Sequence, residues 1–443
     1  MGKTKDNILN FNSSDYPNEI TINGKIENEV NYSYYFNQTN NVVELKWNKT
    51  INNCRNMFFG CRSITEIDLS NFDSSLVTDM SWMFGSCSSL TSIYLSNFNT
   101  SNVKNMNYMF WYCGLLTSLD LSNFTTSNVI DMGGIFTGCS SLVSLNISNF
   151  DTSNVRYMNR MFERCSSLVS LNLSNFDTSN VIYMYSMFEY CSSLVYLDLS
   201  NFNTSKVNDM SHMFESCKTL ISLNLSNFDT SNVKDMDYIF SYCTSLTSLN
   251  LSNFNTSKIN YMHGMFFRCS NLEYINLEIF NNKSSLYYIF DDVPENIVVC
   301  THSTNIINNL NKTKSCYTID CSDNWQLKQK KIINETGLCV NSCSNNTEFG
   351  FEYNGKCYKA CPNDYYIEEG FPLIKKCKCQ LDKCFSCPNV ALKKKLCTKC
   401  NDGYYQKEND SLNIGDYFDC YKNLEGYYLD KNDSLYKKCY YTC

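Results

Sequence analysis

The chain has little of what enzymes need for catalysis. It contains only three histidines among 443 residues, and neither a phosphate-binding glycine loop nor a hydrolase motif occurs in it. Catalysis requires a nucleophile, a base and an orienting group that converge on one point. Such sparse material predicts a protein that is not an enzyme and that uses no cofactor.

Long apolar runs and blocks of positive charge are also missing. No stretch of about 18 apolar residues is present, and the N-terminal segment MGKTKDNILN lacks the apolar core of a secretory signal. The 37 basic and 44 acidic residues are dispersed, with no basic block to follow a phosphate backbone. We therefore expect no membrane span in this chain and no nucleic acid as a partner.

Proline is absent between Pro17 and Pro294, and over most of this range the chain repeats itself every 26 residues. Each copy reads approximately MFxxCSSLxSLxLSNFxTSNVxxMxx. The period is marked by a phenylalanine column: Phe72, Phe98, Phe124, Phe150, Phe176, Phe202, Phe228, Phe254 and Phe280. Nine copies in one register predict nine stacked turns that share an apolar interior.

The L-x-x-L-x-L segment of each copy, for instance at Leu168, Leu171 and Leu173, is the signature of a leucine-rich repeat. Its apolar residues alternate, which predicts a strand with one buried face. The second half of the copy, with Val155 and Met158, supplies the opposite wall. We predict a leucine-rich-repeat solenoid, mainly β, with one parallel strand per 26-residue turn.

The combination of MF-x-x-C-x-x-L-x-x-L-x-L with LSNF-x-TSNV at this period resembles the bacterial-surface-type, or BspA-like, leucine-rich repeats, also known as the 26-residue surface-protein repeat. The resemblance covers about residues 50 to 290. It implies a cell-surface location and a role in adhesion or cell contact, and it carries over no catalytic residues. The cysteine-rich tail departs from the bacterial members and suggests a eukaryotic relative.

A second column, from Cys61 to Cys269, keeps the same period. Neighbouring strands lie about 4.8 Å apart, a spacing that disulfides tolerate. However, parallel side chains point the same way, and an odd number of cysteines cannot pair fully. We predict reduced, buried thiols here, and the same role for Cys54, because a buried cysteine behaves as a small apolar residue.

Two further columns are candidates for a binding surface. The outward position inside L-x-L is mostly polar, and its residues either bind a partner or hydrogen-bond to one another as stacked amides. The more varied column lies in the second half of the copy, where exposed aromatic residues and arginine would anchor an interface. The candidate residues are Trp82, Tyr108, Trp111, Arg160, His212 and Tyr238. The alternative is that these positions vary because nothing constrains them.

The tail from Cys300 onward holds 16 of the 26 cysteines. This density predicts small, loop-rich modules stapled by disulfides in an oxidising compartment. The tail resembles the furin-like and growth-factor-receptor-like cysteine-rich modules. The alternative is a zinc site, because C-x-x-C occurs twice with nine residues between. Its ligands would be Cys384, Cys387, Cys397 and Cys400.

These patterns divide the chain into an N-terminal segment and cap (1–50), the solenoid with its C-terminal cap (51–299) and the cysteine-rich region (300–443). We expect a non-catalytic cell-surface or secreted binding protein whose solenoid contacts a protein or glycan on another cell or matrix. Repeated Asn-x-Ser/Thr sequons predict glycosylation there. The missing secretory signal then indicates truncation at the start. The alternatives are a self-associating coat or matrix protein and an intracellular scaffold with a zinc-binding tail.

Overall fold

The computed structural model divides the chain into two compact units, Met1–Thr313 with Tyr317–Cys321, and Lys314–Cys316 with Ser322–Cys443. Within them it describes residues 4–10, 15–36, 38–280, 286–294, 297–313, 316–318, 321, 331–333, 339–340, 343, 348, 351–353, 356–360, 365–370, 374–379, 384–386, 399–400, 405–407, 420–421, 427–430 and 435–438.

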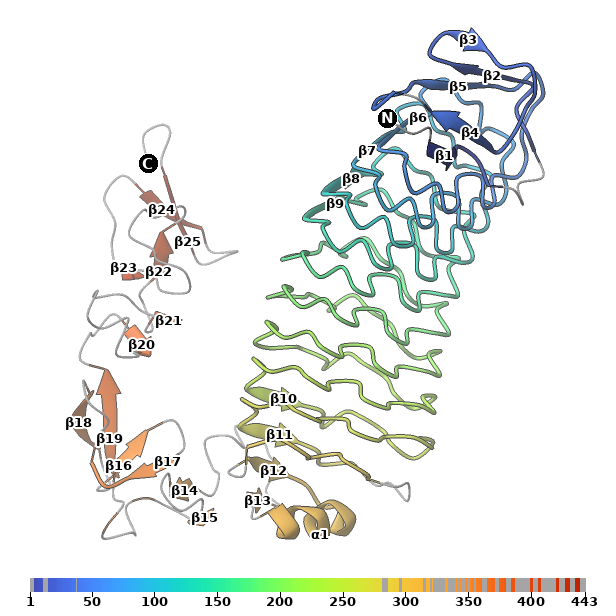
Figure 1. The fold of residues 1–443 in the computed structure, drawn as a ribbon. Coiled ribbons are helices and arrows are strands. Elements are labelled where there is room, and N and C mark those ends of the chain that lie inside the picture. Colours follow the sequence, from blue (N-terminus) through green and yellow to red (C-terminus); the bar gives the residue numbers. More distant parts are fainter. Residues whose placement is uncertain are drawn as a thin grey trace. The chain divides into compact units, whose positions relative to one another are not determined.

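Parallel strands line one wall of the first unit, as the leucine pattern predicts (Figure 1). Two pairs lie toward its N-terminal end: β6 (Glu66–Asp68) with β7 (Ser92–Tyr94), and β8 (Ser118–Asp120) with β9 (Ser144–Asn146). A four-stranded sheet closes the other end: β10 (Ser248–Asn250), β11 (Tyr274–Asn276), β12 (Val298–Cys300) and β13 (Cys316–Thr318). From β6 to β11, paired residues are 26 apart, which confirms the predicted β-solenoid.

The second wall of the solenoid is bonded more continuously than the strand wall. Single parallel bridges link each turn to the next: Asn53↔Asp79, Asp79↔Asn105, Asn105↔Asp131, Asp131↔Tyr157, Tyr157↔Tyr183, Tyr183↔Asp209, Asp209↔Asp235 and Asp235↔Tyr261. On the strand wall, pairing lapses in the middle, because segments 170–172, 196–198 and 222–224 form no strand within the fully described range 38–280. The second wall therefore carries the register through these three turns.

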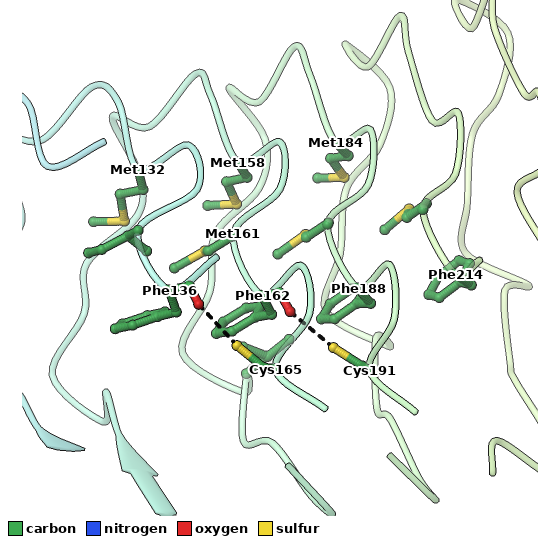
Figure 2. Close-up of a cluster of buried hydrophobic side chains, with 14 of the residues drawn as sticks. Met132, Phe136, Met158, Met161, Phe162, Cys165, Met184, Phe188, Cys191 and Phe214 are labelled. Atoms are coloured by element: carbon green, nitrogen blue, oxygen red, sulfur yellow. Dashed lines mark hydrogen bonds between the residues drawn. The ribbon is translucent and has the colours of Figure 1, made fainter. Parts of the chain in front are cut away.

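Phenylalanine rings form a continuous stack through the core. The rings belong to the Met-Phe or Ile-Phe dipeptides of successive turns: Phe58, Phe84, Phe110, Phe136, Phe162, Phe188, Phe214, Phe240, Phe266 and Phe290. Neighbouring ring centroids are 5.3 to 6.1 Å apart and nearly parallel. Figure 2 shows four of these rings beside the methionines of the same turns. Each aromatic pair adds to the stabilisation from burial of apolar area.

The repeat thiols are free and buried, as predicted. Each thiol from Cys87 to Cys269 donates a hydrogen bond to the carbonyl oxygen of the phenylalanine 29 residues earlier, for instance Cys165 Sγ to Phe136 O at 3.2 Å (Figure 2). Burial raises the pKa of Cys139 and Cys191 to about 12. Because the thiolate is the reactive form, these cysteines are structural.

Buried threonines tie successive turns together on the NF-x-TSN segment. The Thr126 hydroxyl donates to the Asp151 carbonyl oxygen at 2.9 Å and accepts from the Asp151 backbone N–H at 2.7 Å. The same two-bond bridge recurs at Thr100, Thr152, Thr178 and Thr204. Each hydroxyl thus satisfies two backbone groups that the loop conformation leaves without a ladder partner.

Irregular elements close both ends of the solenoid. At the N-terminal end lie β1 (Thr4–Asn7), β2 (Glu19–Ile22), β3 (Lys25–Ile26), β4 (Ser33–Phe36) and β5 (Val43–Lys46), in two small antiparallel sheets. At the C-terminal end, α1 (Thr304–Thr313) buries Ile306 and Leu310 against the core. The first unit also holds the disulfide Cys300–Cys321, so it extends beyond the expected boundary at residue 300. The division into cap, solenoid and tail otherwise stays a prediction.

The described residues of the second unit lie mainly in short strands. These are β14 (Lys331–Ile333), β15 (Cys339–Val340), β16 (Phe351–Tyr353), β17 (Lys356–Tyr358), β18 (Tyr365–Gly370), β19 (Ile374–Cys379), β20 (Cys384–Ser386), β21 (Lys399–Cys400), β22 (Tyr405–Lys407), β23 (Cys420–Tyr421), β24 (Tyr427–Asp430) and β25 (Leu435–Lys438). The described part contains the disulfide Cys343–Cys357. Small sheets with a bridge agree with the predicted disulfide-rich, loop-rich region.

The threonine bridge predicts that substitution by valine destabilises the protein much more at Thr126 than at the adjacent Thr125. Thr126→Val removes both bonds of a buried hydroxyl and should lower the free energy of unfolding by about 1–3 kcal/mol. The matched control Thr125→Val changes an exposed side chain and should stay within about 0.5 kcal/mol. Urea unfolding followed by circular dichroism measures both, and equal costs would contradict a structural role for the bridge.

Candidate binding surface

Two positions in each turn of the second wall have a left-handed backbone. The first is the varied column: Asn56, Trp82, Tyr108, Gly134, Arg160, Ser186, His212, Tyr238 and Gly264, with φ between 53° and 62°. The second lies four residues later: Gly60, Ser86, Tyr112, Gly138, Arg164, Tyr190, Ser216, Tyr242 and Arg268. Bulky residues rarely adopt this conformation. The repeat imposes it through backbone bonds such as Trp82 N–H to Asn107 O at 2.9 Å.

Aromatic side chains from three turns gather near the N-terminal end of this wall. The Trp82 ring stacks on Tyr108, with centroids 4.4 Å apart, and meets Trp111 edge to face at 5.2 Å. Phe59 packs against both tryptophans, and Tyr112 against Trp111 at 4.6 Å. We call these five residues the aromatic cluster. Aromatic groups held rigidly by one another lose little entropy on binding, which suits an interface.

Tyrosine rings of the first left-handed column lie over the glycine of the following turn. A β-carbon added to Gly134 would lie 2.2 Å from a ring carbon of Tyr108, and one added to Gly264 would lie 2.3 Å from a ring carbon of Tyr238. No side chain fits under these rings. At these two places the tyrosine ring of one turn requires the glycine of the next, which is a structural constraint on a column that varies in sequence.

An arginine pair shares one carboxylate in the middle of the wall. Glu163 Oε2 lies 2.9 Å from Arg160 Nη1, and Glu163 Oε1 lies 3.4 Å from Arg164 Nε. The Glu163 side chain is only 7% exposed, whereas those of Arg160 and Arg164 are 40% and 47% exposed. The guanidinium groups also lie over Tyr185 and Tyr190. Two cations against one buried anion leave net positive charge at the surface.

A histidine pairs with a carboxylate in a later turn. His212 Nδ1 lies 2.5 Å from Glu215 Oε2, and the imidazole stacks on Tyr238 with ring centroids 5.4 Å apart. The hydrogen bond to Glu215 is the largest influence on the His212 pKa and raises it above the ordinary value, against the lowering effect of burial. Protonation of His212 is therefore favoured by folding.

The predicted binding residues occupy one wall but not one patch. Trp82, Tyr108 and Trp111 meet in the aromatic cluster, and His212 meets Tyr238. Arg160 lies between the two groups along the column. All six are half-buried rather than fully exposed, because each packs on a neighbouring turn. That they bind a partner stays a prediction.

A cavity at this surface lies beside the predicted column. It has a volume of about 620 Å³ and follows the residues on either side of the repeat cysteines from Arg62 to Lys218. We call it the corner groove. Its lining residues are Arg62, Ser86, Ser88, Trp111, Tyr112, Gly114, Gly138, Ser140, Arg164, Ser166, Tyr190, Ser192 and Lys218.

Few of the residues that line the corner groove were predicted from the sequence. Trp111 is the only predicted binding residue that lines it, and Tyr112 was noted only as a neighbour. Arg62, Arg164 and Lys218 were missed. A signal existed, because the column four residues after the predicted one varies in the same way, but the sequence does not tell which variable columns face one another.

The outward Asp and Asn residues of the L-x-L segment make hydrogen bonds within their own turn. Its Asp and Asn side chains accept a hydrogen bond from the backbone N–H two residues later, for instance Asp198 Oδ1 from Ser200 N–H at 2.9 Å and Asn224 Oδ1 from Ser226 N–H at 3.1 Å. This is the Asx turn, which ends the strand segment. These residues terminate the segment locally, and that the column binds a partner or forms a ladder of stacked amides stays a prediction.

The zinc alternative falls only partly within the described residues. Cys384 in β20 and Cys400 in β21 are direct partners across an antiparallel pair, whereas Cys387 and Cys397 lie outside the described residues. In the part of the chain that the structure describes, no group of three or more His, Cys, Asp or Glu could hold a metal ion. The zinc site stays an alternative prediction.

Comparisons with known proteins concern the repeat region. The family model described as "Mycoplasma protein of unknown function, DUF285" matches residues 30–141, 113–196 and 193–295. A leucine-rich repeat protein from Bacteroides ovatus is similar in structure, with 18% identity over 66% of this chain and 72% of that chain and a TM-score of 0.36.

A leucine rich cell surface protein from Faecalibacterium prausnitzii is also similar, with 16% identity over 58% of this chain and 78% of that chain and a TM-score of 0.29. No curated protein matches the chain. Among the described residues, no helix has the length and apolar character needed to cross a membrane.

The contact between Tyr108 and Gly134 predicts that substitution by alanine is tolerated far less at Gly134 than at Gly60. Gly60→Ala is the control, because Gly60 also has positive φ but open space around it, and should cost about 1–2 kcal/mol of backbone strain. Gly134→Ala adds overpacking and should cost about 1–3 kcal/mol more. Thermal and urea unfolding measure the difference. In a Tyr108→Asn background the excess should disappear, and its persistence would contradict the contact.

The raised pKa of His212 predicts a pH-dependent stability. Its contribution is complete below the unfolded value of about 6.5 and is lost as pH rises through the higher folded value. Urea midpoints between pH 5.5 and 8.5 should therefore fall with pH in the parent protein, and this component should vanish in His212→Asn. The control His302→Gln changes an exposed histidine and should retain it. An unchanged pH profile in His212→Asn would refute the assignment.

Proposed function

The chain belongs to the family described as Mycoplasma protein of unknown function, DUF285, and we propose that this member is a non-catalytic binding protein, presented on a cell surface or secreted, whose solenoid corner contacts a protein or glycan partner. The observation that carries the proposal is the contrast between a uniform scaffold and a varied corner. The same core residues recur in every turn, whereas the two left-handed columns hold tryptophan, tyrosine, arginine, histidine, serine and glycine.

The chemistry of that corner supports binding rather than scaffolding alone. The aromatic cluster presents partly exposed rings that are already fixed by one another, and the arginine pair presents two cations beside it. Aromatic and arginine side chains provide most of the binding energy in many interfaces. The long wall allows many weak contacts to act together, so affinity would increase with the length of the partner that is engaged.

The two disulfides among the described residues support a location outside the cytosol. Cys300–Cys321 fixes the C-terminal end of the first unit, and Cys343–Cys357 lies in the second unit. Disulfides of this structural kind persist in oxidising compartments. The free thiols of the repeats are buried and have raised pKa values, so they are protected from exchange with the bridges of the tail.

The proposal predicts that the aromatic cluster is required for attachment. Full-length protein with Trp82→Asn, Tyr108→Asn and Trp111→Ser should bind intact cells or extracellular matrix at least about tenfold more weakly than the parent, because each aromatic anchor is worth on the order of 1–2 kcal/mol. Asparagine suits the left-handed positions. Labelled protein titrated onto cells and matrix, with flow cytometry and plate readout, measures the affinity.

The matched control changes exposed apolar residues on the strand side: Val143→Ser, Val169→Ser and Ile221→Ser, which are 60%, 52% and 54% exposed. This variant should bind like the parent. Sedimentation of both variants and the parent measures self-association. If the parent binds neither cells nor matrix but self-associates, the solenoid is a structural coat component and the proposal is wrong.

A further inference from the structure

Beyond a general binding role, the lining of the corner groove defines one kind of ligand. We propose that the groove binds an extended acidic polysaccharide, a chain of sugars that carries carboxylate or sulfate groups. The inference rests on the proposed function and specifies the ligand of the same wall. Three properties of the groove carry it: its charge, its aromatic walls and the hydrogen-bonding state of its serine hydroxyls.

The charge of the groove is positive at both ends and in the middle. Arg62 and Lys218 lie six repeats apart, about 30 Å at β spacing, and Arg164 lies between them. None of the lining residues, all within the described range, is acidic. Glu163 is buried and shared between Arg164 and Arg160, so these three groups together keep one net positive charge. In a chain of net charge -7, this local reversal fits a long anionic ligand.

The walls of the groove carry three aromatic side chains, Trp111, Tyr112 and Tyr190. Tyr112 is 42% exposed, and its ring lies over Gly138 of the next turn, so one face is supported by protein. A supported ring with an open face is amphipathic and buries flat, partly apolar groups. The C–H face of a sugar ring is such a group, whereas the flexible side chains of an acidic peptide offer no comparable surface.

The serine hydroxyls that line the groove can accept hydrogen bonds from the hydroxyls of a sugar. Ser166 Oγ donates to the Ser140 carbonyl oxygen at 3.2 Å, and Ser140 and Ser192 donate to the carbonyl oxygens of Gly114 and Ser166, each at 3.5 Å. A hydroxyl has one proton and two lone pairs. Its remaining capacity is therefore to accept, and a polysaccharide carries hydroxyl donors along its whole length, whereas an acidic peptide offers only its backbone N–H groups as donors.

The experiment compares four probes by isothermal titration calorimetry on the full-length protein near physiological salt. Heparin oligosaccharides carry sulfates and carboxylates, polygalacturonate oligosaccharides carry carboxylates alone, maltooligosaccharides are neutral, and poly-L-glutamate is an anion without sugar rings. We expect binding to at least one acidic saccharide, weaker binding as salt rises, and affinity that increases with chain length up to the span from Arg62 to Lys218.

Two variants of equal charge test the site. Arg62→Gln with Lys218→Gln removes both end cations, which are exposed and make no side-chain bond within the described residues. This variant should lower the affinity for long acidic chains about tenfold and leave short ones nearly unchanged. The matched control Lys104→Gln with Lys234→Gln removes two exposed lysines outside the groove and should bind like the parent. Thermal unfolding verifies that all variants are folded.

Three outcomes would overturn the inference: no acidic saccharide binds, poly-L-glutamate binds as tightly as the saccharides, or the control variant loses as much affinity as the groove variant. The last two would indicate an unspecific response to charge or an acidic peptide as ligand. In each case, the attachment of the parent to cells through the aromatic cluster is measured separately. A failure of the polysaccharide proposal is therefore distinguishable from a failure of the proposed binding function.

Discussion

Backbone hydrogen bonding between successive turns of the second wall is the constraint on which the other features of the solenoid depend. Each turn donates to the next at the same position, as in Phe84 N–H to Met109 O and Phe110 N–H to Ile135 O, both at 2.9 Å. This fixes the spacing between turns at that of a β-ladder. Side chains at equivalent positions of neighbouring turns therefore lie next to one another. For this reason the phenylalanine rings stack, each thiol reaches the equivalent carbonyl oxygen, and each threonine bridges the equivalent loop.

The same constraint also restricts which residues can occupy the two left-handed columns of the corner. Two residues per turn are held in the left-handed region by the repeat, and the side chains that project from them lie along the stacking direction. A large residue in one turn therefore lies on its counterpart in the next, so that Tyr108 requires Gly134 and Tyr238 requires Gly264. The expected opposition between a binding surface and an unconstrained surface is too simple, because the column is structurally constrained even where it differs between turns.

The period, the strands and the inward residues could be predicted from the sequence because they follow from which positions are apolar. The Phe136 ring and the Cys165 thiol are buried for the reason that the pattern gives. The corner groove could not be predicted, because it depends on backbone handedness at Tyr112 and Arg164, and the repeat pattern does not specify φ. Likewise, a polar residue at Asp198 fits both a binding surface and a ladder of stacked side chains, and only the geometry shows that it forms an Asx turn.

For the proposed binding function, the regular repetition of one turn determines which kind of partner fits the corner groove. Equivalent atoms recur at a constant interval along the corner, so the partner that uses most of them is itself a linear chain with a regular repeat. Each contact is then weak. Equivalent positions hold different residues in different turns, for instance Arg62 in one turn and Ser140 in another, so the ligand preference changes locally while the neighbouring turns stay the same. Affinity would come from the number of turns engaged, and specificity from the order in which charged, aromatic and small residues follow one another along the groove.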